Sequence, residues 1–173
     1  FRCFGEKEGR EAFRLQDMNL ASGWPGGIRS DGLINKSMEV SKVKSYKFWF
    51  ATGSQDLYGD ECLAHVAEHS RRIVDYLNQS GKLPYEVVWK PTLITNELIR
   101  RTFNEANMDE ECAGVITWMH TFSPAKSWIL GLQEYRKPLL HLDTQFNQEI
   151  PYDTIDMDFM NENQSAHGDR EYG

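Results

Sequence analysis

The chain has 173 residues, of which 40% are hydrophobic and 26% charged, and its net charge is −7. This composition is typical of a globular protein of about one domain, and no apolar run reaches the ~18 residues of a membrane span. The acidic balance disfavours nucleic acid and anionic membranes as partners, because its long-range field repels phosphate. Three cysteines without C-x-x-C spacing predict reduced thiols, as in a cytoplasmic protein.

The two ends of the chain differ from its middle. Residues 1–37 show no sustained hydrophobic period and include a stretch rich in glycine, so we predict a poorly ordered extension there. A sharper hypothesis is that the natural start is Met38 and that the preceding residues are translated upstream sequence. Residues 38–173 then form the α/β domain. Because the pattern stops at Gly173 without completing a further strand, we expect a truncated sheet.

The first half of the domain alternates strand and helix. An aromatic, β-prone run at residues 46–52 predicts a strand. Apolar residues at helical spacing over 60–79, closed by Gly81, predict a helix. Residues 85–89 predict the second strand, and Asn96 is the expected N-cap of the helix that follows.

The alternation continues in the second half. Residues 112–119 are almost continuously apolar, which indicates a strand buried on both faces, as in a parallel sheet. Ser123 and Pro124 predict the next helix start, with the serine as cap. Residues 139–142 predict a fourth strand. The whole pattern predicts a Rossmann-like, three-layer α/β domain with a parallel sheet of about four strands.

Ligands of such sheets bind beyond the carboxyl ends of the strands. The loops at those ends, residues 53–59, 120–124 and 143–147, are rich in amides, hydroxyls and aromatic rings. Amides and hydroxyls both donate and accept hydrogen bonds, which suits a neutral polyol. The first loop lacks G-x-G-x-x-G and a Walker lysine, so a nucleotide site is disfavoured. Its glycines are expected at least to make a tight turn.

Histidines raise the question of a metal. His65 and His69 are spaced i, i+4 but do not form H-E-x-x-H, so exposed helix surface is the favoured interpretation. His120 and His141 lie near strand ends, where hydrogen bonding is more common than metal binding. His167 is the most interesting histidine, because it lies among small and charged residues with little core character.

The carboxylates Asp153, Asp156 and Asp158 alternate with apolar residues. They could serve acid–base chemistry or bind a hard cation, but a solvated stretch entering a helix is the favoured interpretation. No motif supports nucleophilic catalysis.

Three long motifs carry a resemblance to a known family. Residues 48–59, 114–126 and 153–168 resemble the matching segments of L-arabinose isomerases, and the resemblance covers roughly residues 44–173. It implies an aldose–ketose isomerase that converts L-arabinose into L-ribulose in arabinose catabolism, often also D-galactose into D-tagatose. It further implies a homohexamer with its pockets between subunits.

The resemblance also implies which groups do the chemistry. A divalent cation, usually Mn²⁺, is held in the family by two carboxylates and two histidines from later in the chain, so we expect no catalytic or metal-binding residue here and no activity of this chain alone. The implied substrate contacts are Gln55, Leu57, Tyr58, Phe122, Gln164 and His167. Two alternatives remain: a non-catalytic, Rossmann-like sugar-binding module, and a pseudo-enzyme subunit that contributes only assembly surface.

Overall fold

The computed structural model describes residues 45–173. The predicted extension at residues 1–37 and the hypothetical start at Met38 therefore lie outside the described residues, and both stay predictions.

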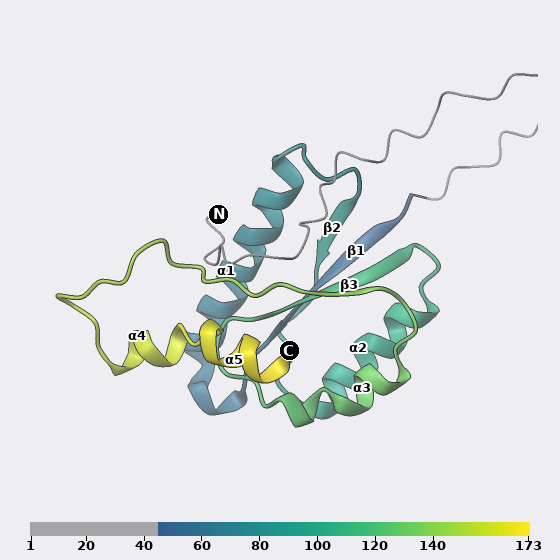
Figure 1. Cartoon of the computed structure of the whole chain (residues 1–173). Helices are drawn as coiled ribbons and strands as arrows, with labels where there is room; N and C mark the ends of the chain where they lie inside the picture. Colours follow the sequence, from purple (N-terminus) through teal and green to yellow (C-terminus); the bar gives the residue numbers. More distant parts are fainter. Residues whose placement is uncertain (1–44) are drawn as a thin grey trace, which may run out of the picture. The chain divides into compact units, whose positions relative to one another are not determined.

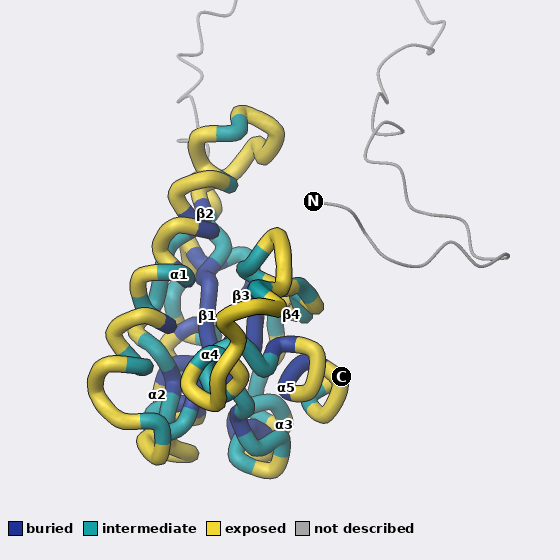
Figure 2. Tube along the Cα trace, turned by 90° about the vertical axis from the view of Figure 1, so that its left-hand side faces the viewer, coloured by how far each residue is buried: buried dark blue, intermediate teal, exposed yellow. Residues whose placement is uncertain are grey.

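A parallel sheet forms the centre of the described domain. Its strands are β1 (Lys47–Gly53), β2 (Glu86–Trp89), β3 (Cys112–Met119) and β4 (Leu139–His141). They are hydrogen-bonded in the order β2-β1-β3-β4 (Figure 2). In the pairing of the two central strands, Gly53 lies opposite Met119. The two strands therefore end level, and the loops that follow them start side by side.

Helices cover both faces of the sheet. The helical segments are η1 (Asp56–Tyr58), α1 (Gly59–Gln79), α2 (Asn96–Met108), η2 (Ala125–Ser127), α3 (Ile129–Glu134), α4 (Met157–Glu162) and α5 (Ser165–Tyr172). Helix α1 packs on β1 and β2, while α2 packs on β3 and on α3 (Figure 1). This arrangement confirms the predicted three-layer α/β fold. Among residues 45–173, no helix combines the length and apolar character that crossing a membrane requires.

Alternate residues of the strands belong to two separate hydrophobic clusters. On the α2 side, Trp49 and Val115 pack with the fully buried Phe103. On the α1 side, Phe50 and Trp118 are fully buried. Burial of each such side chain stabilises the fold by about 1.5–3 kcal/mol. In Figure 2 the central strands are accordingly dark blue, and the outer helix turns are yellow.

Two predicted helix caps are wrong. The N-cap of α2 is Thr95, not Asn96, because the Thr95 hydroxyl accepts a hydrogen bond from the backbone N–H of Leu98 at 3.2 Å. Ser123 does not cap a helix. Its Oγ accepts a hydrogen bond from the indole Nε1 of Trp128 at 3.0 Å, and the chain passes through the short η2 before α3 begins.

Candidate functional site

The loops after β1 and β3 are joined by side-chain hydrogen bonds. Gln55 Nε2 donates to the backbone oxygen of Phe122 at 3.0 Å. Behind this contact, the hydroxyls of Ser54 and Thr121 are 2.7 Å apart, and both residues are buried. These bonds fix the relative position of two loops that lie 67 residues apart in sequence. We call the edge formed by residues 54–58 and 120–124 the rim.

Glycines allow this close approach. A Cβ on Gly53 would overlap Met119 Sδ and lie 2.7 Å from Trp128 Cζ2. Gly59 has φ 79° and ψ 168°, a conformation that essentially only glycine adopts, and it redirects the chain into α1. The predicted tight turn at these glycines is therefore confirmed for Gly59, whereas Gly53 serves close packing.

The carboxyl-terminal segment that contains α5 also contacts the rim. The backbone N–H of Gln164 donates to the carbonyl of His120 at 3.0 Å. The imidazole of His167 lies 4.9 Å, between ring centroids, from the phenyl ring of Phe122. Gly168 faces the end of β3, where an added Cβ would lie 2.9 Å from the carbonyl oxygen of Thr121. Helix α5 thus packs directly on the rim.

Asp169 anchors α5. Its buried carboxylate accepts hydrogen bonds from the backbone N–H of Met119 at 2.9 Å and of Thr144 at 3.3 Å. His141 Nε2 lies 3.2 Å from Asp169 Oδ1. Burial raises the pKa of Asp169 above its ordinary value, although the imidazole of His141 and the backbone N–H of Met119 oppose this shift. No sequence motif singles out Asp169, so its role was not predicted.

The six predicted contact residues differ in their placement. Gln55, Phe122 and Gln164 are partly buried at the rim, and His167 is exposed beside them. Tyr58 is partly buried, and burial raises the pKa of its phenol. Leu57 is 84% exposed. All six belong to the rim or to the Gln164–His167 segment, so one edge of the sheet offers amides, an imidazole and aromatic rings to solvent.

A second polar cluster was not predicted. His69 Nδ1 lies 2.7 Å from His120 Nε2 and 3.8 Å from Glu162 Oε1. The favoured interpretation of exposed helix surface is correct for His65 but wrong for His69, which is partly buried and stacks on Phe146 at 3.8 Å. The third predicted loop, residues 143–147, therefore supplies a wall to this histidine cluster through Phe146.

The three aspartates take the structural role that was favoured for them. Asp153, Asp156 and Asp158 are exposed, and Asp156 caps α4 by accepting a hydrogen bond from the N–H of Phe159 at 2.8 Å.

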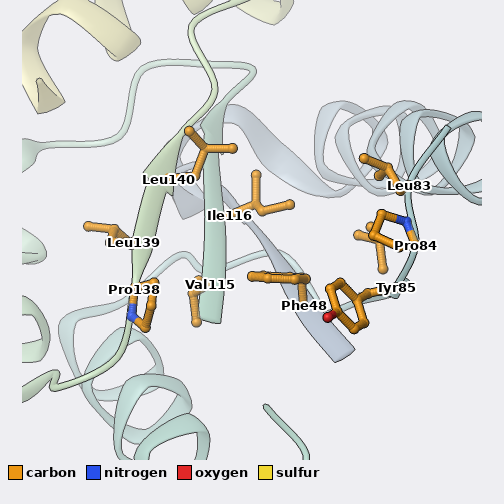
Figure 3. A pocket seen from close by; sticks show the side chains of 10 residues that line it. Phe48, Leu83, Pro84, Tyr85, Val115, Ile116, Pro138, Leu139 and Leu140 are labelled. Carbon is orange, nitrogen blue, oxygen red and sulfur yellow. The ribbon is translucent and has the colours of Figure 1, made fainter. Parts of the chain in front are cut away.

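An apolar cavity of about 230 Å³ lies elsewhere on the domain (Figure 3). Its lining consists of Phe48, Leu83, Pro84, Tyr85, Val87, Val115, Ile116, Pro138, Leu139 and Leu140. These residues come from the four strands and from the segments that precede β2 and β4, and none of them belongs to the rim. The phenol of Tyr85 is the one polar side-chain group among them, so this cavity cannot orient the several hydroxyls of a sugar.

The fold and the rim together define an α/β domain whose ligand edge is suited to an uncharged polar molecule. Residues 42–173 match the family described as L-arabinose isomerase N-terminal domain, and the chain belongs to that family.

Full proteins that contain such a domain are similar to this chain. It is 66% identical over 131 residues to the L-arabinose isomerase of Geobacillus stearothermophilus, covering 76% of this chain and 26% of that protein. It is 64% identical over 132 residues to that of Clostridium beijerinckii, covering 76% of this chain and 27% of that protein. It is 62% identical over 128 residues to that of Phocaeicola vulgatus, covering 74% of this chain and 25% of that protein. The chain thus spans about a quarter of the length of these relatives.

Proposed function

We propose that this chain forms part of an aldose–ketose isomerase that converts L-arabinose into L-ribulose, with D-galactose to D-tagatose as a second reaction. The names of the relatives support the reaction. The observation that carries the role of this chain is the meeting of Gln55, Phe122 and His167 at one edge of the sheet. These groups come from three separate segments, and a sugar-binding edge is a physical reason for holding them together.

Each group has a stated task in the proposed site. The amide of Gln55 is held by the Phe122 carbonyl, so it is oriented before a sugar arrives. The Phe122 ring offers an apolar surface to the C–H face of the sugar. The exposed imidazole of His167 and the amide of Gln164 exchange hydrogen bonds with its hydroxyls. The role of this chain is therefore to bind and orient the substrate rather than to move its hydrogen.

The metal of the family does not fit the described residues. Within residues 45–173, the cluster of His69, His120 and Glu162 is the group whose ligand atoms could surround one ion. It contains one carboxylate rather than two, and nitrogen outnumbers the oxygen that Mn²⁺ prefers. None of the six rim contacts belongs to it. We therefore propose that the Mn²⁺ ligands lie in the part of the protein that this chain does not cover, and that the pocket is completed in a homohexamer.

Sugar binding is tested by titrating the ¹⁵N-labelled 173-residue chain with L-arabinose. We expect affinity no tighter than millimolar, with amide shifts confined to residues 54–58, 120–124 and 164–168. Gln55→Ala should reduce these shifts, while Asp153→Ala, an exposed residue outside the rim, should leave them unchanged. Shifts elsewhere on the domain would contradict the assignment. Micromolar binding would favour the self-sufficient sugar-binding module instead.

The isomerase reaction is tested in a chimera. Residues 42–173 replace the matching segment of the Geobacillus stearothermophilus enzyme, to which this chain is 66% identical over 131 residues. We expect the chimera to form L-ribulose with Mn²⁺, and His167→Ala to lower kcat/KM at least tenfold. A folded chimera that makes no L-ribulose would refute the proposal.

A further inference from the structure

We propose that His69, His120 and Glu162 form a binding site for one divalent cation of borderline softness, such as Zn²⁺ or Co²⁺. The site would join α1, the end of β3 and α4. The inference concerns a structural ion and is independent of the isomerase reaction proposed above.

The first argument is convergence. One ligand atom from each of the three residues lies within 4.8 Å of the other two. His69 comes from α1, His120 follows β3 and Glu162 ends α4, so three elements that are distant in sequence direct ligand atoms to one point. The donor set of two imidazoles and a carboxylate is one that zinc accepts with an open fourth position.

The second argument is the unusual burial of His120. Its side chain is fully buried, and its Nδ1 has no hydrogen-bond partner among the described residues. The polar contact of this ring is through Nε2, which is directed at His69. The burial therefore fixes the ring with Nε2 toward His69, so Nε2 is the nitrogen that a cation in this cluster would use, with the ring proton on Nδ1.

A neighbouring histidine extends the cluster. His65 lies one helical turn before His69, and its Nδ1 is 3.3 Å from Glu162 Oε2. His65 is exposed, so either its imidazole or a water molecule can complete a tetrahedral shell. Phe146 stacks on His69 and shields one side of the cluster from solvent.

Ion binding requires a small rearrangement. The 2.7 Å separation between His69 and His120 is a hydrogen bond, in which one imidazole donates to the other. Two nitrogens bound to one zinc at about 2.0–2.1 Å are about 3.3 Å apart, so the rings must separate by about 0.6 Å. The ring that donates the hydrogen bond must also move its proton through solvent to its other nitrogen, so that both rings stay neutral. His69 is partly exposed on α1 and can make this movement. Nitrogen-rich ligation favours Zn²⁺, Co²⁺ or Ni²⁺ over Mg²⁺ and Ca²⁺.

The test is a titration of the purified 173-residue chain with Co²⁺ at neutral pH. We expect one equivalent to bind with the visible absorption of tetrahedral Co²⁺ and a rise in Tm, and Mg²⁺ to give neither. Glu162→Gln should weaken Co²⁺ binding at least tenfold. Asp158→Asn is the matched control, because Asp158 is an exposed acid of the same helix, and it should bind Co²⁺ like the parent.

Three results would overturn the proposal. The first is the absence of saturable binding to the parent chain. The second is equal affinity of Glu162→Gln and Asp158→Asn. The third is an intense thiolate-to-cobalt charge-transfer band, which would assign the ion to cysteine. Since Glu162 is only partly buried, its conservative variant is expected to fold, and circular dichroism checks this.

Discussion

Substituting Gly168 with alanine sets two known effects against each other. In an exposed helix, alanine is favoured over glycine by about 1 kcal/mol. In α5, however, the new Cβ would lie 2.9 Å from both the Met119 Cβ and the Thr121 carbonyl oxygen. Both are atoms of the chain at the end of β3, and neither can rotate away as the tip of a flexible side chain would.

The steric cost is therefore expected to prevail. Overpacking of this kind costs about 1–3 kcal/mol, and relief requires α5 to move away from the rim. After the gain in helix propensity is subtracted, we expect Gly168→Ala to lower the free energy of unfolding by up to about 2 kcal/mol. The shift of α5 should also displace His167 from Phe122.

Gly131 in α3 provides the matched control. Its added Cβ would lie 3.2 Å from Ile99 Cγ2 and 3.4 Å from Phe103 Cδ2, which are side-chain atoms that can adjust. We expect Gly131→Ala to change stability by less than about 1 kcal/mol. Urea unfolding followed by tryptophan fluorescence measures both variants. If Gly168→Ala is more stable than the parent by about 1 kcal/mol, as in an unhindered helix, the tight contact between α5 and β3 does not exist and the reasoning fails.

Three further predictions use the same unfolding assay. Thr95→Ala should destabilise the domain by about 1 kcal/mol through loss of the α2 cap, whereas Asn96→Ala should have little effect; the opposite order would restore the original cap assignment. Gly59→Ala should cost about 1–3 kcal/mol, because alanine is strained at φ 79°; a neutral result would show that this turn relaxes. For Asp169 the folded pKa is raised, so the stability it contributes is present below its unfolded pKa of about 3.9 and is lost as pH rises through the folded pKa. The stability of the parent relative to Asp169→Asn should therefore fall as pH rises above about 4, and a constant or rising difference would contradict the shift.

The sequence predicts the sheet well where burial determines the pattern. The continuous apolar run of β3 lies between two helical layers, and its predicted bounds agree with Cys112–Met119. The cap at Ser123 fails for a different reason. Its hydroxyl is used by the indole of Trp128, and this contact depends on how the chain folds back after β3. Local propensity contains no information about such a competitor.

The rim could be predicted from the fold class, whereas the histidine cluster could not. Loops at the ends of parallel strands must share an edge, so the meeting of Gln55 with Phe122 follows from the fold class. The meeting of His69 with Glu162 does not, because α4 is placed by contacts that no pattern reports. The i, i+4 spacing of His65 and His69 was visible, but Glu162 lies on another helix far along the chain.

His120 couples these two features. Its backbone carbonyl accepts the hydrogen bond from Gln164 N, which holds the start of α5 at the rim, while its imidazole is directed at His69. Glu162, two residues before Gln164, enters the histidine cluster from α4. The same short segment is therefore held on one side by the cluster and on the other by the rim. A change that separates Glu162 from the histidines should loosen Gln164 as well, because only Asn163 lies between them. This coupling gives the buried, incompletely hydrogen-bonded imidazole a structural role, because it helps to hold the segment that completes the proposed ligand edge.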